Sequence, residues 1–123
     1  MGSDEQNGRG EQDEVLRLVA DEYAKEILVH LSEERLSAAE LDEVCRAAES
    51  TVYDRLARLE DAGLVTEHLQ VDPGGHHRNV YGIRVDAVRV EIRNGGYDVR
   101  LQVREDAADR IAQMWQTVRG ERE

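Results

Sequence analysis

The chain has 123 residues, with 27 acidic against 16 basic side chains and a formal net charge of −11. This length predicts one small domain, and no apolar run approaches the ~18 residues that a membrane span requires. The chain opens without the charged and apolar regions of a secretory leader, so we expect a cytoplasmic protein. Its single cysteine, Cys45, excludes an internal disulfide.

The acidic composition opposes nucleic acid as a partner in ordinary salt. However, only one of the 16 basic residues is a lysine, Lys25. Abundant acids with scarce lysine and few large apolar side chains suit a protein that must stay hydrated in brine. There the screening length falls to about 3 Å at 1 M salt, so distant carboxylates hardly repel phosphates. We therefore expect a halophilic protein.

The N-terminal third predicts a tail followed by helices. Residues 1–11 are polar and lack periodicity, which predicts a disordered tail. Between positions 13 and 32 the apolar residues fall at helical spacing, and Asp21 can divide this stretch into two helices because Asp is a good cap. One stripe of this stretch contains Val15, Leu16, Val19 and Tyr23, and Ile27, Leu28 and Leu31 continue it.

The next segment predicts a short helix, a turn and a longer helix. Ser37 and Glu40 form a capping box, after which a short helix turns Leu41 and Val44 inward and ends near Cys45. The longer helix spans about 49–62 and buries Val52, Leu56 and Leu59 on one face. Gly63 follows as its stop signal.

Alternating apolar residues predict two hairpins. Strands over 64–71 and 79–85 flank the turn sequence Asp72-Pro73-Gly74-Gly75. A second hairpin turns at Asn94-Gly95, a type I′ signal. A two-residue loop there pairs Ile92 with Tyr97, Val90 with Val99 and Val88 with Leu101, so all six side chains share one face. A helix over about 105–119 ends the chain.

This order of elements predicts the α+β fold class, as a winged helix-turn-helix with an extra C-terminal β-hairpin and a C-terminal dimerisation helix. The sequence from Ser50 to Val65, STVYDRLARLEDAGLV, closely resembles the recognition helix of archaeal and bacterial winged-helix repressors of the ArsR, PadR and MarR type. The resemblance covers about residues 15–85. With the halophilic composition, the chain is similar to haloarchaeal regulators of this class, including one that acts in the oxidative-stress response. The expected organisation is a tail at 1–11, the DNA-binding domain at 12–85, the hairpin at 86–103 and the dimerisation helix at 104–123.

A recognition helix buries one stripe and offers the other to the major groove of double-stranded DNA. Short hydroxyl side chains near its start can reach phosphates or base edges, and arginines are the natural guanine or phosphate ligands. In the wing, glycines allow close approach to a phosphate, and an arginine suits the minor groove. The predicted DNA-binding residues are Ser37, Glu49, Ser50, Thr51, Tyr53, Asp54, Arg55, Arg58, His76, His77, Arg78 and Asn79.

Residues 37–85 hold nine acidic and five basic side chains, so a clamp of many Lys–phosphate contacts is not available. We expect affinity to rest on a few Arg, hydroxyl and backbone N–H contacts, with monovalent cations bridging carboxylates to phosphates. We expect no other cofactor.

Other chemistry finds little support in the sequence. The adjacent His76 and His77 cannot close a zinc site, and no other ligand motif completes one. We expect His30 and His68 to be framework residues and Cys45 to be a buried, inert thiol that plays no part in a peroxide response. No P-loop, GxGxxG or nucleophile elbow indicates an enzyme.

A reader of two half-sites is a two-fold dimer, and we expect a homodimer. The predicted dimerisation residues are Val15, Val19, Ile111, Met114, Trp115 and Val118. Folding of the last helix onto its own hairpin remains an alternative. For function, the alternatives are a winged-helix protein–protein interaction module, which the acidic composition favours, and a small-molecule sensor or enzyme with an incidental winged helix.

Overall fold

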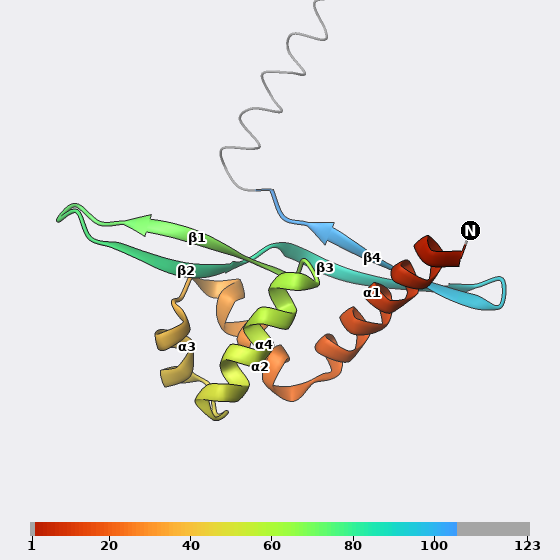
Figure 1. Cartoon of the computed structure of the whole chain (residues 1–123), viewed down its shortest axis with the longest axis horizontal. Coiled ribbons are helices and arrows are strands. Elements are labelled where there is room, and N and C mark those ends of the chain that lie inside the picture. Colours follow the sequence, from red (N-terminus) through yellow and green to blue (C-terminus); the bar gives the residue numbers. More distant parts are fainter. Residues whose placement is uncertain (1, 106–123) are drawn as a thin grey trace, which may run out of the picture.

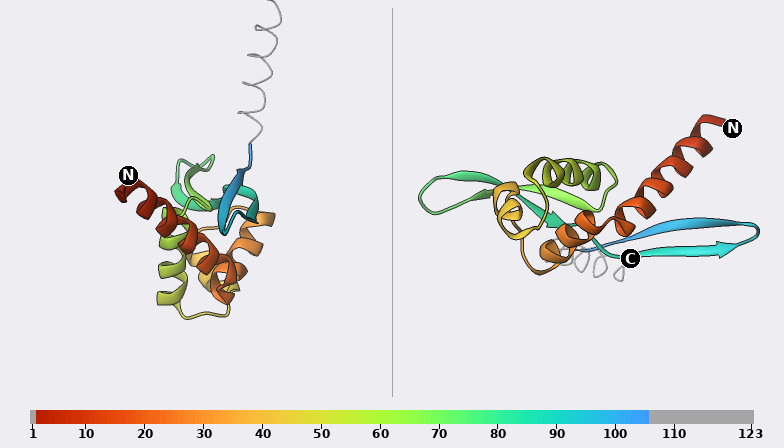
Figure 2. Two further views of the ribbon diagram at one scale, coloured as in Figure 1. Left: turned by 90° about the vertical axis from the view of Figure 1, so that its right-hand side faces the viewer. Right: turned by 90° about the horizontal axis from the view of Figure 1, so that it is seen from below.

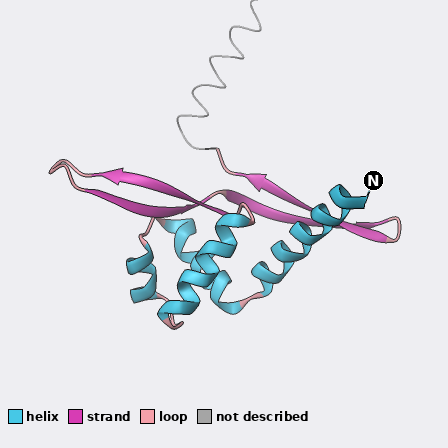
Figure 3. Cartoon of the chain, viewed as in Figure 1, coloured by secondary structure: helices cyan, strands magenta, loops and turns pink. Residues whose placement is uncertain are grey.

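The computed structural model describes residues 2–105, in which helices precede two antiparallel hairpins (Figure 1). The helices are α1 (Gly2–Ala20), α2 (Glu22–Glu33), α3 (Ala38–Val44) and α4 (Glu49–Asp61). The strands are β1 (Val65–Val71), β2 (His77–Ile83), β3 (Val85–Arg93) and β4 (Gly96–Val103). Helices and strands are thus separated along the chain, as Figure 3 shows. Most of the predicted C-terminal helix lies outside the described residues.

The boundary between α1 and α2 confirms the predicted break. The Asp21 carboxylate accepts a hydrogen bond from the backbone N–H of Ala24 at 2.8 Å, which caps the N-terminus of α2. The expected disordered tail is wrong for residues 2–11, because α1 begins at Gly2. A helix that is already formed adds one hydrogen bond for each further residue, so it can extend beyond the apolar stripe that predicted it.

The core lies where α1, α2, α3 and α4 meet the base of the hairpins. Val52, Leu56 and Leu59 are buried on α4, as expected. The fully buried side chains also include Leu18, Ile27, Leu41, Leu64, Val65 and Val80. The prediction for Val44 is wrong, because its side chain is 47% exposed. The inward positions of the short α3 are Leu41 and its C-cap Cys45, which lie four residues apart.

The helix-turn-helix has the predicted caps. Glu40 N–H donates to the Ser37 hydroxyl at 3.1 Å, and the Glu40 carboxylate accepts from Ser37 N–H at 2.9 Å, which completes the capping box. After α4, Gly63 has a φ of +81°, the left-handed conformation of a helix stop. A Cβ there would lie 2.9 Å from Arg84 Nη1, the end of a flexible side chain that can move, so the backbone conformation is what requires glycine.

In the β1–β2 hairpin, which we call the wing, the second strand begins and ends two residues earlier than the sequence indicated. His77 already belongs to β2 and pairs with Val71, whereas we expected the strand to begin at Asn79. A third short segment joins β2 through two hydrogen bonds between Leu36 and Tyr81, of 3.1 and 2.7 Å. This bridge anchors the wing to the segment between α2 and α3.

The β3–β4 hairpin confirms its predicted turn and register. Asn94 and Gly95 have φ values of +54° and +77°, as a type I′ turn requires. All three expected cross-strand pairs are present, Ile92–Tyr97, Val90–Val99 and Val88–Leu101. The two hairpins extend in opposite directions from the helices, as Figures 1 and 2 show. In α1, Gln12 accepts a hydrogen bond from Val99 N–H at 2.9 Å, which ties α1 to β4.

None of the helices among the described residues has both the length and the apolar content to cross a membrane.

Candidate nucleic-acid interface

The outer face of α4 consists of the residues on the side opposite its buried stripe. Its exposed residues are Glu49, Ser50, Tyr53, Asp54, Ala57, Glu60 and Asp61. Four of these seven are carboxylates and none is basic, so the outer face of α4 is negatively charged. Tyr53, 47% exposed, is its one aromatic residue, and Ser50 is exposed at the start of the helix. Apart from its carboxylates, the outer face of α4 therefore provides two hydroxyl groups and one aromatic ring for contact with a partner.

Arg55 lies on the flank of α4 that faces α2 instead of on the outer face. Its Nε and Nη2 donate to the two carboxylate oxygens of Asp21 at 2.9 and 3.2 Å, and its Nη1 donates to Asp54 at 2.6 Å. The guanidinium carbon lies 5.8 Å from the centre of the Tyr23 ring. The hydrogen bonds from Arg55 hold the pKa of Asp21 below its usual value. One carboxylate thus caps α2 and binds α4.

Arg58 makes a similar contact with α1. Its Nε and Nη2 donate to the two oxygens of Glu14, each at 2.9 Å, in the bidentate arrangement that favours an Arg–carboxylate pair. These bonds hold the pKa of Glu14 below its usual value. The predicted roles of Arg55 and Arg58 as DNA ligands stay predictions, and the structure gives both arginines internal partners.

Arg78 is the third predicted arginine, and it lies one residue inside β2 instead of at the tip of the wing. Its Nε donates to Gln70 at 2.7 Å and its Nη1 to Glu40 at 3.0 Å, which links the wing to the start of α3. Its side chain remains 50% exposed. His76, His77 and Asn79 are exposed beside it. Residues 76–79 of the wing therefore form a polar stretch that contains one arginine, whereas Leu69 and Val71 are exposed apolar residues of β1.

The remaining predicted DNA-binding residues lie at the starts of α3 and α4. The Ser37 hydroxyl accepts the capping bond of α3, so it already has a structural partner. Thr51 is half-buried in the first turn of α4, and Glu49 is exposed before it. Among the predicted residues of α4, Ser50 and Tyr53 combine exposure with neutral polar atoms.

The expected dimerisation residues fall into two groups. Val15 is only 5% exposed and packs in the core of its own chain, so its predicted place in a dimer interface is wrong. Val19 is half-buried against the same core. Ile111, Met114, Trp115 and Val118 lie outside the described residues.

Cys45 is 9% exposed, as the prediction of a buried thiol requires. Burial, helped by the nearby charges of Glu26 and Asp42, raises its pKa to about 11. Because the thiolate is the reactive form, such a thiol reacts slowly with oxidants.

Comparison with known proteins agrees with this geometry. Residues 19–68 match the family model described as a helix-turn-helix domain. The matched residues run from the end of α1 through α2, α3 and α4 into β1, and the match supports a DNA-binding transcription regulator in general. No curated protein matches the chain.

Sequence reasoning missed the acidic partners of the three arginines. Asp21 and Glu14 precede Arg55 and Arg58 by 34 and 44 residues, so no local pattern connects them. The one available signal was their position, because both acids lie near the apolar stripe of α1 and α2 that had to pack on the helix bearing the arginines.

Proposed function

We propose that the protein is a homodimeric, sequence-specific DNA-binding transcription regulator that works in high salt in the cytoplasm. In this proposal α4 enters the major groove and the wing contacts the adjacent minor groove. The observation that carries it is the helix-turn-helix at 19–68 combined with an outer face of α4 that no described element covers. The resemblance to haloarchaeal regulators, one of which acts in the oxidative-stress response, leads us to include this response in the proposal.

Ser50 and Tyr53 are the residues of α4 that we assign to base or phosphate contacts. Ser50 lies in the first turn, where the helix N-terminus favours a phosphate. The Tyr53 ring can pack on a thymine methyl group while its hydroxyl donates to a phosphate. Arg78 supplies the cation of the wing, since half of its side chain remains accessible. We assign Arg55, whose side chain is 21% exposed, chiefly to the structure of the domain.

High salt resolves the conflict between the acidic outer face and the phosphate backbone. Carboxylates within a few ångströms of phosphates repel them even at a short screening length, unless a cation lies between them. Glu49 and Asp54 are exposed beside Ser50 and Tyr53, so they are the carboxylates that bound potassium ions would bridge to the backbone. This part of the proposal predicts that affinity survives, or increases, as KCl rises.

The proposed homodimer places a second copy on the apolar face near the tip of the β3–β4 hairpin. Val88, Val99 and Leu101 at the base of that face pack against the core, whereas Ile92 is 83% exposed and Tyr97 46% exposed. An apolar face that continues from the core into solvent is typical of a protein–protein contact. Four of the dimerisation residues predicted from the sequence, Ile111, Met114, Trp115 and Val118, lie among the 18 residues from 106 onward.

Sedimentation tests the dimer. We expect the Ile92→Glu variant to sediment as a lighter species than the wild type, and Trp115→Ala to weaken the dimer. An unchanged sedimentation profile for both variants would contradict this part of the proposal.

A mobility shift with genomic fragments in concentrated KCl tests DNA binding. We expect the wild type to shift specific fragments, and Ser50→Ala to weaken the shift severalfold. Ser32→Ala, which changes an exposed serine on α2, is the matched control and should behave as the wild type. Failure of the wild type to bind any duplex in high salt would overturn the proposal.

One observation favours the alternative of a protein–protein interaction module. The three arginines predicted to bind DNA all have acidic partners within the chain, and the outer face of α4 carries only acidic charge. Such a face would attract a basic protein partner. The same mobility shift separates the two functions, because only the regulator binds duplex DNA in the absence of other proteins.

A further inference from the structure

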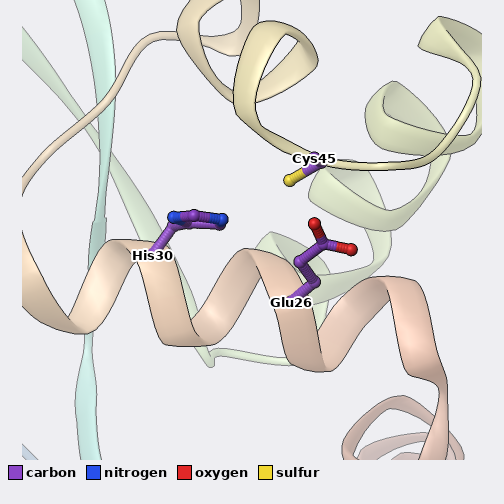
Figure 4. Close-up of side chains that lie close together, drawn as sticks. All are labelled: Glu26, His30 and Cys45. Carbon is purple, nitrogen blue, oxygen red and sulfur yellow. The ribbon is translucent and has the colours of Figure 1, made fainter.

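Three side chains with different metal-binding atoms meet between α2 and the turn that leads from α3 to α4 (Figure 4). Glu26 and His30 lie four residues apart on α2, so they project from one face of the helix. Cys45 is the C-cap of α3. A carboxylate oxygen, an imidazole nitrogen and the Cys45 Sγ all lie within 4.8 Å of one another.

We propose that Glu26, His30 and Cys45 form a binding site for a divalent transition-metal ion of the zinc type. Zinc binds sulfur, imidazole nitrogen and carboxylate oxygen at about 2.0–2.3 Å, usually in tetrahedral geometry. Bonds of that length place ligand atoms roughly 3–4 Å apart, so small side-chain rotations would close the site around one ion. Three protein ligands leave the fourth position to water. Magnesium and calcium prefer oxygen ligands and fit this mixed set poorly.

The surroundings of the three ligands suit a cation. Arg46 N–H donates to a carboxylate oxygen of Glu26 at 3.1 Å, the kind of second contact that orients a metal ligand. Asp42 adds a further negative charge near the sulfur. The cysteine is largely covered, whereas Glu26 and His30 are half-buried, so an ion could enter from solvent. Binding would replace the thiol proton, which would pass to solvent.

The site would have a structural consequence for the helix-turn-helix. It joins α2 to the residue just before the Arg46–Ala48 turn, and α4 begins immediately after that turn. A bound ion would therefore stabilise the position of α4 relative to α2. The proposal stands apart from DNA binding, and it revises the expectation that His30 and Cys45 are only framework residues. Sequence spacing did not reveal the site because its third ligand comes 15 residues after the i, i+4 pair.

Cobalt(II) titration of the full-length protein in concentrated KCl tests the site, because this ion substitutes for zinc and is coloured. We expect one equivalent of cobalt to produce a sulfur-to-cobalt charge-transfer band, and zinc to abolish it. Cys45→Ser should lose the band. His30→Gln and Glu26→Gln should each weaken cobalt binding by at least about tenfold. Circular dichroism of each variant shows whether it is folded.

The matched control is the double variant His76→Gln/His77→Gln, which removes the exposed histidine pair of the wing and should bind cobalt as the wild type does. Zinc should also raise the melting temperature of the wild type and leave that of His30→Gln unchanged. The absence of a charge-transfer band would overturn the proposal. So would a cobalt affinity that is unchanged from the wild type in both His30→Gln and Glu26→Gln. Because these two variants change half-buried residues on α2, they test the site even if Cys45→Ser does not fold.

Discussion

The two sides of α4 differ in chemistry although they belong to the same 13-residue helix. On the flank that faces α1 and α2, Arg55 forms two hydrogen bonds with the Asp21 carboxylate, which caps α2, and Arg58 forms two with the Glu14 carboxylate of α1. On the outer face, exposed residues such as Ser50 and Tyr53 lie among acids. The basic residues of the helix hold the domain together, whereas its outer face is left acidic and hydroxyl-bearing.

This difference teaches how an arginine in a recognition-helix pattern should be interpreted. In a chain with 27 acidic residues, each arginine on a packed flank has acidic neighbours within reach. An Arg–carboxylate pair that is partly shielded from solvent persists better in salt than an exposed one. We therefore expect variants of the flank to change stability and variants of the outer face to change DNA binding.

The largest expected effect belongs to Asp21→Ala on the flank. This change removes both the cap of α2 and the partner of Arg55, so we expect a loss of about 2 kcal/mol in the free energy of unfolding. Chemical denaturation at constant salt measures it. Asp61→Ala, which removes an exposed acid of the same type, should change stability by less than about 0.5 kcal/mol. Equal losses in the two variants would contradict the special role of Asp21.

Tyr53→Ala on the outer face should lower DNA affinity and leave the free energy of unfolding unchanged, the reverse of what we expect for Asp21→Ala. We expect at least about a tenfold loss of operator affinity, equivalent to about 1.4 kcal/mol, and no change in stability, because the side chain is 47% exposed. Fluorescence anisotropy with a labelled operator measures the affinity. Tyr53→Phe separates the ring from the hydroxyl and should retain part of the binding. A loss of stability without a loss of affinity would show that this face is structural.

The flank should also make stability depend on pH. The pKa values of Asp21 and Glu14 are lowered by their arginine partners, so their contribution is fully present above the pKa values of the unfolded chain and is lost as pH falls through the lower values of the folded protein. We expect the free energy of unfolding to decrease below about pH 4. The double variant Asp21→Asn/Glu14→Gln should show a shallower decrease. A slope as steep as that of the wild type would contradict this assignment.

The smallest expected effect on stability belongs to Glu14→Gln, which sharpens the comparison at Arg58. We expect a loss of about 0.5 kcal/mol, since about a third of each partner's side chain is exposed. The change also releases Arg58 and removes a negative charge, so operator affinity should increase severalfold. Glu11→Gln makes the same charge change at an exposed position of α1. An equal gain in both variants would show that charge alone, and not Arg58, improves binding.

Much of the fold followed from local sequence patterns. The capping box at Ser37, the stop at Gly63 and the turn at Asn94-Gly95 depend on residues adjacent in the chain, and the structure confirms all three. The extension of α1 to Gly2 did not follow, because no apolar periodicity marks it.

The candidate site was less predictable than the fold. Sequence identified α4 and the residues along it, but not which side each arginine takes, because that depends on packing against α1 and α2. The same limitation applies to Arg78, whose partner Glu40 lies 38 residues away. Pairing between distant elements is the information that a single sequence does not carry.

The central claim is that the outer face of α4 contacts duplex DNA despite its acidic charge, with cations between carboxylates and phosphates. Operator affinity measured from low to multimolar KCl, for the wild type and for Glu49→Gln, tests this most directly. We predict that wild-type affinity holds or rises with KCl, whereas Glu49→Gln binds severalfold more tightly at low salt and gains less from added salt. A steep and continuous loss of affinity with rising KCl, identical in the two proteins, would contradict the account.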